Sequence, residues 1–212
     1  MAFATIGTAG IQAQSIDLST KVTGTLPVPN GGLGIASGTT GQFLKFTGTE
    51  TLASAAGEGI TEYDQWRING TTNLVGNGTT TLTSNFERND TDFDKIGTGM
   101  SESSGVFTFG ATGVYQIIFD AFFRTDGGAR PMIGAVIQTT TDNSNYNNRA
   151  FSYTSGYTSE AYASSLVICG FDVTNTSTHK VRFRARHGDT TNIQGSTTSN
   201  YTCFTFTRLG ST

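Results

Sequence analysis

The residues that could carry acid–base or nucleophilic chemistry are few in this sequence. Its two histidines, His179 and His187, each stand beside a segment expected to turn, where histidines are usually exposed to solvent. A catalytic triad needs a Ser or Cys nucleophile held against a histidine, and nothing in the spacing indicates one. The 16 Asp and Glu residues are scattered, so no carboxylate pair for glycoside hydrolysis stands out. We therefore expect a protein that is not an enzyme and predict no catalytic residue.

Residue types that bind metals or form disulfides are equally sparse. Cys169 and Cys203 are far apart, lie in apolar strand patterns and are expected to be free, buried thiols. The run Asp142-Asn-Ser-Asn145 begins like a calcium loop but lacks the downstream Gly and Glu that complete one, so a hydrated loop is expected. We predict no cofactor and no metal site, and leave open a structural calcium ion without assigned ligands.

The strongest charged pattern is Lys180-Val-Arg-Phe-Arg-Ala-Arg186. Alternate residues of a strand share a face and stand about 7 Å apart, so Arg182, Arg184 and Arg186 should form a ladder opposite an apolar core face. Guanidinium groups at this spacing suit carboxylates or phosphates. One interpretation is a surface that holds anionic sugars. The other, which we favour, is pairing with acids such as Asp120, across the sheet or between subunits.

Tyrosines in polar segments form a second candidate binding surface. Tyr offers a stacking area at low entropic cost, and Asn and Ser offer adaptable hydrogen bonds, a composition that suits carbohydrate. The same tyrosines also fit half-buried strands. The candidate receptor-binding residues are Tyr146, Tyr153, Tyr157, Asn145 and Asn192.

Composition indicates an all-β, turn-rich chain. Charged residues make up 14% of the sequence, against about a quarter in an ordinary globular chain, and Gly, Thr, Ser and Asn take their place. The net charge of −3 gives no basic surplus for nucleic acid. No apolar run is long enough to span a bilayer, and no secretory signal is expected. We predict neither a nucleic-acid partner nor membrane insertion.

In an all-β chain, strands must position the candidate residues. The two clearest strand patterns lie in the segment from Gly105 to Phe123. Phe107 and Phe109 alternate with Val106 and Thr108 in the first. In the second, the face expected in the core holds Tyr115, Ile117, Phe119, Ala121 and Phe123. The opposite face holds Val114, Gln116, Ile118, Asp120 and Phe122. That second face is too apolar for solvent contact alone, so we expect it to pack on a partner.

Evenly spaced strand patterns continue on both sides of this segment and predict an antiparallel sandwich. They cover Thr79–Phe86, Phe93–Ile96, Pro131–Thr141, Tyr162–Val173, His179–Arg186 and Tyr201–Arg208. Polar loops are expected at Thr141–Arg149 and His187–Asn200.

Residues 1–60 differ from the rest in having few aromatic and charged residues. We expect them to form an extended, mostly irregular stem, with residues 61–212 as a head domain. Ile11–Lys21 is the one helix candidate, and Thr40–Gly48 is expected to form a short hairpin with apolar residues on both faces. A weakly ordered linker is the alternative.

The spacing of Gly105, Phe107, Gly113 and Tyr115, followed by alternating aromatics, resembles the globular head of complement component one, subcomponent q, a relative of the tumour necrosis factors. The resemblance covers roughly Asp64 to Thr212. It implies a jelly-roll sandwich of about ten antiparallel strands that assembles as a homotrimer. The alternative is another antiparallel sandwich with a glycine hairpin. The candidate trimer-interface residues are Trp66, Ile118, Asp120, Phe122, Arg182, Arg184 and Arg186.

A second resemblance lies in the stem. Val22-Thr-Gly-Thr-Leu-Pro-Val-Pro-Asn-Gly-Gly-Leu-Gly34 resembles a repeated element of bacteriophage tail-fibre shafts and attachment regions, with Leu33 where that family commonly has Thr. A single copy argues against a long shaft. Together the resemblances imply a virion protein: a short trimeric tail fibre that binds a host-surface glycan and attaches to another virion protein through residues 1–60. The alternatives are a capsid decoration protein or head fibre on the shell and, as an outsider, a glycan-active enzyme.

Overall fold

The structure is a computed structural model that describes residues 39–48, 51–55, 59–89, 93–158, 160–188 and 191–212. Contacts divide the chain into two units, Met1–Gly59 and Ile60–Thr212, and each is described by itself. The expected helix at Ile11–Lys21 and the Val22–Gly34 element lie outside the described residues. A helix that could span a membrane is absent from the described ranges.

The described part of the first unit is an antiparallel hairpin of β1 (Phe43–Gly48) and β2 (Thr51–Ala55). Its register pairs Phe43 with Ala55 and shifts between Phe46 and Gly48. The range Thr40–Gly48, which was expected to form the whole hairpin, supplies only its first strand. All residues of β1 are exposed. A hairpin alone buries too little apolar surface to be stable by itself.

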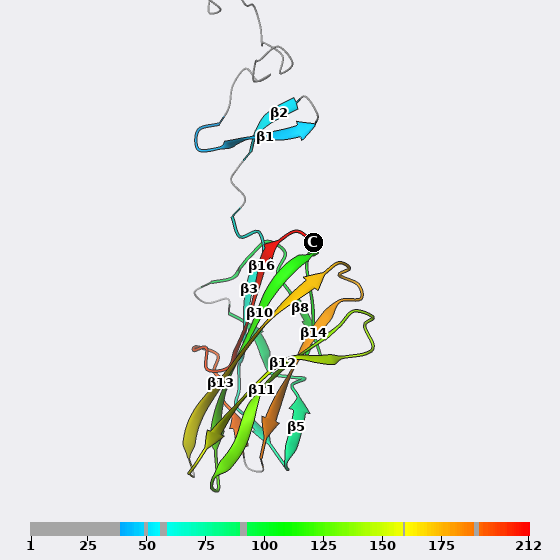
Figure 1. The fold of residues 1–212 in the computed structure, drawn as a ribbon. Coiled ribbons are helices and arrows are strands. Elements are labelled where there is room, and N and C mark those ends of the chain that lie inside the picture. The colour runs from blue at the N-terminus through cyan, green and yellow to red at the C-terminus, as the bar shows by residue number, and fades with distance from the viewer. Residues whose placement is uncertain (1–38, 49–50, 56–58, 90–92, 159, 189–190) are drawn as a thin grey trace, which may run out of the picture. The chain divides into compact units, whose positions relative to one another are not determined.

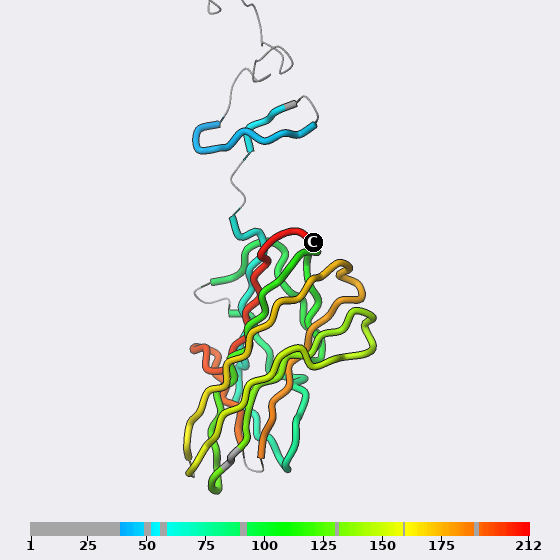
Figure 2. The backbone as a smooth tube through the Cα atoms, viewed as in Figure 1, coloured from blue at the N-terminus to red at the C-terminus, as the bar shows by residue number. Residues whose placement is uncertain are grey.

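The second unit contains two antiparallel sheets (Figures 1 and 2). Sheet I has eight strands in the order β4-β15-β10-β16-β3-β6, with β13 on β10 and β7 on β3; sheet II has six in the order β12-β11-β14-β9-β8, with β5 on β14. The strands of sheet I are β3 (Tyr63–Ile68), β4 (Thr72–Leu74), β6 (Phe86–Arg88), β7 (Lys95–Ile96), β10 (Gly113–Thr125), β13 (Ala161–Val173), β15 (Thr191–Ile193) and β16 (Cys203–Gly210). The strands of sheet II are β5 (Gly78–Thr81), β8 (Ser101–Ser103), β9 (Val106–Thr108), β11 (Arg130–Thr140), β12 (Asn147–Gly156) and β14 (Lys180–His187). This is the predicted all-β jelly-roll sandwich.

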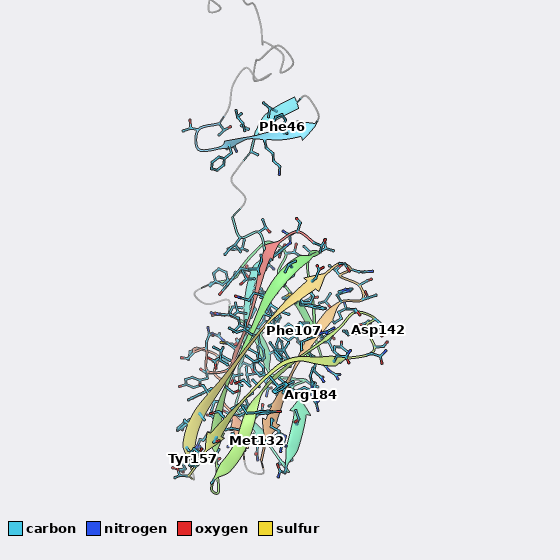
Figure 3. The ribbon with its side chains drawn as sticks, viewed as in Figure 1. Phe46, Phe107, Met132, Asp142, Tyr157 and Arg184 are labelled. Atoms are coloured by element: carbon cyan, nitrogen blue, oxygen red, sulfur yellow. The ribbon has the colours of Figure 1, made fainter. Side chains whose placement is uncertain are left out.

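The core between the sheets is built from the predicted inward faces. Phe107 lies fully buried at its centre (Figure 3), with ring centroids of Trp66 and Phe206 each 5.3 Å away. Phe119 stacks on Phe204 at 4.8 Å. The predicted core face of β10 is buried along its whole length, and so are the alternate apolar residues of β11 and β14. These faces therefore confirm the period-2 predictions.

A buried polar network fastens β3 to β6 and to the chain before β8. Both carboxylate oxygens of Asp64 accept hydrogen bonds from Arg88, at 3.0 and 3.1 Å. Asp64 Oδ2 also accepts from Trp66 Nε1 at 2.9 Å and from the Met100 backbone N–H at 2.7 Å. The Arg88 guanidinium lies 4.6 Å from the centre of the Trp66 ring. Most of the Trp66 side chain is therefore buried by contacts within one chain.

Some predicted strands and loops differ from the structure. Thr79–Phe86 is not one strand: β5 ends at Thr81 in sheet II and β6 begins at Phe86 in sheet I, because the chain crosses between the sheets here. The expected strand Phe93–Ile96 shortens to Lys95–Ile96. The predicted loops give way to strands in part: β12 begins at Asn147, and β15 lies within 187–200 with Ile193 buried.

Candidate interaction surfaces

Both histidines are buried, which corrects the expectation that they are exposed. They lie next to or at the ends of β14, where each packs against the sandwich. Ring atom Nε2 of His187 lies 2.7 Å from the Thr80 hydroxyl, and His179 stacks on Phe171 at 5.6 Å. Their side-chain hydrogen-bond partners in the described chain include no Ser or Cys. Nor do the described residues bring together three or more His, Cys, Asp or Glu side chains that could hold a metal ion.

The Asp142 run forms a closed turn between β11 and β12. The carboxylate of Asp142 accepts from the Asn145 amide at 2.6 Å, from the Asn145 backbone N–H at 2.7 Å and from the Thr140 hydroxyl at 2.7 Å. These donors, with the Ser144 backbone N–H, hold the pKa of Asp142 well below its usual range. The carboxylate therefore orders its own loop.

The two cysteines are free, as predicted, and only half-buried. Burial raises the pKa of the Cys169 thiol to about 11. Burial and then the nearby Asp120 carboxylate raise the pKa of Cys203 to about 11. Both thiols are therefore poor nucleophiles at neutral pH.

The outer side of sheet I carries an exposed apolar surface. The register places Ile118 of β10 opposite Ile168 of β13 and Thr205 of β16, so the surface runs across neighbouring strands. Phe122 stacks on Tyr162 at 5.5 Å and contacts Tyr201 at 5.7 Å. We call this surface the apolar face; it comprises Ile118, Phe122, Tyr162, Leu166, Ile168 and Tyr201.

Asp120 lies within the apolar face. It stands opposite Leu166 on one side and Cys203 on the other. Its Oδ1 is buried and has no hydrogen-bond partner, and burial raises the pKa of the carboxyl group. The charged carboxylate is therefore destabilising in a single chain, because it is partly removed from water while its Oδ1 has no hydrogen-bond partner.

The predicted pairing of the arginine ladder with Asp120 across one sheet is wrong. Arg182, Arg184 and Arg186 lie on β14 of sheet II, whereas Asp120 lies on β10 of sheet I. Both strands alternate inward and outward side chains, but their outward side chains lie on opposite sides of the core. Pairing between subunits stays a prediction.

The three arginines do form the predicted ladder on the outer side of sheet II. Arg182 Nε donates to Gln138 Oε1 at 2.8 Å, and its guanidinium lies 4.0 Å from the centre of the Tyr146 ring. Arg184 Nη2 donates to the Thr79 carbonyl at 2.8 Å. No ion pair involves any of the three among the described residues.

Two exposed aromatic residues continue this surface onto β12. Phe151 is opposite Val136, and Tyr153 is opposite Gly134, which itself pairs with Arg186. The two rings lie 5.5 Å apart. We call the combined surface the arginine face; it comprises Tyr146, Phe151, Tyr153, Arg182, Arg184 and Arg186.

The predicted receptor-binding residues do not form one cluster. Asn145 and Tyr146 share the β11–β12 turn, and Tyr153 lies on the outer side of β12. Tyr157 lies in the turn after β12, at the opposite end of the domain from Asp142 (Figure 3). Asn192 lies on β15 of sheet I, where its amide donates to Asp126. Phe151 was missed, although its alternation with Tyr153 was a visible strand signal.

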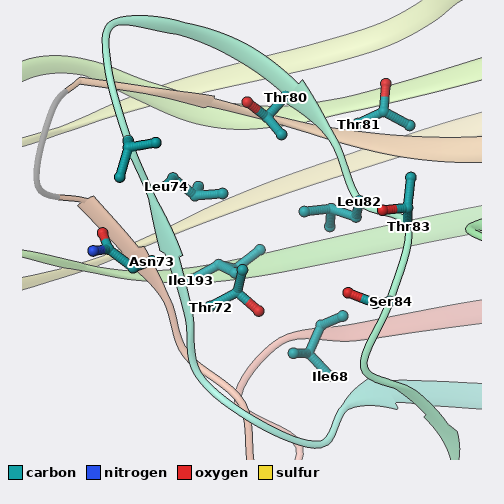
Figure 4. Close-up of a pocket in the computed structure, with 11 residues that line it drawn as sticks. Ile68, Thr72, Asn73, Leu74, Thr80, Thr81, Leu82, Thr83, Ser84 and Ile193 are labelled. Atoms are coloured by element: carbon teal, nitrogen blue, oxygen red, sulfur yellow. The ribbon is translucent and has the colours of Figure 1, made fainter.

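A small pocket lies beside β4 and β5 (Figure 4). It has a volume of about 180 Å³, below the range of roughly 300 Å³ upward typical of small-molecule sites. Its apolar lining comes from Ile68, Leu74, Val75, Leu82 and Ile193, and its polar lining from Thr72, Asn73, Thr80, Thr81, Thr83 and Ser84. The pocket has no titratable residue, so its lining offers hydrogen bonds and no acid–base group.

Comparison with known proteins supports the fold. Protein-family models give no match to the chain, and neither does a search of curated proteins. Among solved structures, the chain is similar to Eiger TNF from S. frugiperda, at 11% identity and a TM-score of 0.54 over 71% of this chain and 93% of that one. It is also similar to murine APRIL at pH 5.0, at 14% identity and a TM-score of 0.51 over 70% and 98%. Identities this low establish the jelly-roll fold alone, as the head's resemblance predicted.

Proposed function

We propose that this chain is a bacteriophage virion protein: a short trimeric tail fibre whose jelly-roll head binds a host-surface glycan without catalysis. The observation that carries the proposal is the apolar face of sheet I. Leu166 is 52% exposed and Ile168 49% exposed, beside Phe122 and two tyrosines. Contiguous exposed apolar surface of this kind marks an interaction site, and a closed ring of identical subunits covers it in every copy.

The proposed trimer contact uses only part of the predicted interface. Ile118, Asp120 and Phe122 lie on the apolar face. Trp66 is buried inside one chain and the three arginines lie on the other sheet. We therefore assign subunit contacts to β10, β13 and β16, in place of the predicted pairing of the arginines with Asp120 between subunits.

Receptor binding by the proposed trimer would be strengthened by its three identical heads. Three identical heads on one particle engage a repetitive glycan together, so weak individual sites add through avidity. The Val22–Gly34 element supports attachment to another virion protein through residues 1–60. The exposed apolar side chains of β1, Phe43 and Phe46, give that unit a surface to bury in such a contact.

The test has two steps. Light scattering on the purified full chain should give roughly three times the subunit mass of 22.4 kDa. A monomer at micromolar concentration would overturn the proposal. Gold-labelled Fab fragments against the head should then mark the tail of intact virions. Labelling of the capsid shell would instead establish the decoration-protein alternative.

A further inference from the structure

We propose that the arginine face of sheet II is a binding site for an acidic glycan, a polysaccharide whose pyranose rings carry carboxylates. This deepens the proposed receptor-binding function and rests on it, since it names the ligand class and the surface used. The juxtaposition that carries it is a ladder of three guanidinium groups, with no carboxylate partner among the described residues, beside two exposed aromatic rings.

The charge on this face is uncompensated among the described residues. Elsewhere Arg67, Arg88 and Arg124 each lie within 3.2 Å of a carboxylate oxygen. Arg182, Arg184 and Arg186 have no such neighbour, although all three keep part of their surface exposed. Protein guanidinium groups stay charged at any physiological pH, so the face presents a row of positive charges on a chain whose net charge is −3.

Two acidic side chains on the described elements that border the ladder are already engaged. Asp142, in the turn that carries Tyr146, accepts hydrogen bonds from Thr140, Ser144 and Asn145. Glu102, on the edge strand β8, accepts from the Gly105 backbone N–H at 2.6 Å. These contacts fix both carboxylates in their own loops, which leaves the ladder open to an external anion.

Two members of the ladder, Arg182 and Arg184, are also held in place before any ligand arrives. Gln138 accepts from Arg182 Nε and donates onward to Asn148 at 2.7 Å, while the Tyr146 ring covers the guanidinium. The terminal nitrogens of Arg182 keep free donors, because only its Nε has a hydrogen-bond acceptor in the described chain. Donors fixed in this way lose less conformational entropy on binding.

The aromatic rings argue for a sugar rather than a simple anion. Phe151 is 61% exposed and Tyr153 52% exposed, and they lie next to each other on β12, the edge strand of sheet II. Neighbouring exposed rings of this size form an apolar patch that can pack on a sugar. A Cβ at Gly134 would lie 2.8 Å from Tyr153 Cδ1, so the absent side chain lets the tyrosine ring lie over the strand. The rings on β12 and the arginines on β14 flank β11, and about 10 Å separates those two strands. A pyranose stacked on either ring would bring its carboxylate within reach of a guanidinium fork.

The arginine face also stays open in the proposed trimer. The apolar face lies on sheet I and the arginine face on sheet II, on opposite sides of the core. Subunit contacts through β10, β13 and β16 would leave β11, β12 and β14 free on their outer side. Each trimer would then present three such faces.

The test measures binding of the full chain to immobilised polygalacturonate, alginate and polysialic acid, with neutral dextran and inorganic polyphosphate as comparison ligands. Arg184→Gln and Arg186→Gln should each weaken binding to an acidic glycan by about tenfold or more, since each removes a charge-assisted hydrogen-bonding group. Tyr153→Ala should weaken binding to glycans and leave any binding to polyphosphate unchanged. Arg124→Gln is the matched control, because it removes the same charge from sheet I, where the guanidinium already pairs with Glu160.

Equal loss in the Arg124 control, or equal affinity for polyphosphate and the acidic glycans, would show unspecific attraction of anions and overturn the site. Failure of the wild type to bind all three acidic glycans would overturn it as well. Failure of the site is distinguishable from failure of the proposed function, because the particle mass and the position of the gold label do not depend on the arginines. Tight binding to neutral dextran that is unchanged in Arg186→Gln would overturn the arginine face as the binding site. Glycan recognition would then lie on another surface of the head.

Discussion

Truncation of one side chain on the apolar face gives a quantitative test of the proposed trimer. Leu166 projects from β13 opposite Asp120, and about half of it, 52%, is exposed in one chain. Leu166→Ala removes most of that surface while leaving the core unchanged, because the inward neighbours Ser165 and Val167 keep their places.

The expected size follows from the exposed fraction. Full burial of a leucine stabilises by about 1.5–3 kcal/mol, so covering the remaining half contributes about 1 kcal/mol per subunit. A trimer contains three copies, so the substitution costs about 3 kcal/mol per particle. That cost lowers the association constant about 100-fold. Because this constant contains the third power of the monomer concentration, the midpoint of assembly shifts by the square root, about tenfold.

Light scattering or sedimentation over a dilution series measures that midpoint for the wild type and the variant. Val75→Ala is the matched control, since Val75 is an equally aliphatic, 73% exposed residue in the turn after β4. Circular dichroism checks that both variants keep the wild-type fold. An unchanged midpoint in Leu166→Ala, with the fold intact, would refute the assignment of the apolar face to subunit contacts.

Three further predictions concern single residues. Because burial raises the pKa of Asp120 above its ordinary value of 3.8, the folded chain holds this proton more tightly than the unfolded chain, and stability falls as pH rises through the raised pKa. Asp120→Asn should therefore remove part of this decline, which urea unfolding at a series of pH values between 4 and 7 tests; identical profiles would contradict it. Asp64→Asn leaves the partly buried Arg88 charge without its carboxylate and should destabilise the head by about 3 kcal/mol in thermal unfolding, and a loss below about 1 kcal/mol would mean that the pair is not desolvated as its geometry implies. Cys203, with its pKa raised to about 11, should react with iodoacetamide at pH 8 far more slowly than in urea-unfolded chain; equal rates would show that the thiol is not shielded.

The sequence allowed the faces of individual strands to be predicted, because the side-chain alternation of a strand is a local property. The alternation in β10 placed Phe119 in the core and Asp120 outside, and the alternation in β14 did the same for Phe183 and Arg184. Both predictions needed nothing beyond neighbouring residues.

Which sheet a strand joins is a long-range property, and the failures are of this kind. Asp120 and Arg184 were each correctly placed on an outer face, but their strands belong to different sheets, so the two side chains cannot pair across one sheet. His187 was expected to be exposed because it stands beside an expected turn, yet β5, more than a hundred residues earlier, covers its ring through Thr80. The strand break after Thr81 follows from the crossing between sheets, which no local pattern marks.

The position of β16 in sheet I sets the order of events when the chain is made. This strand lies between β10 and β3, and Gln65 hydrogen-bonds to Thr205 across 140 residues of sequence. While a ribosome is still adding residues before Gly210, β3 and β10 have no shared neighbour and the surface formed by β13, β10 and β16 is incomplete. Sheet I can therefore close only after β16 has been made and has left the ribosome, and any contact through the apolar face in the proposed trimer must follow that closure.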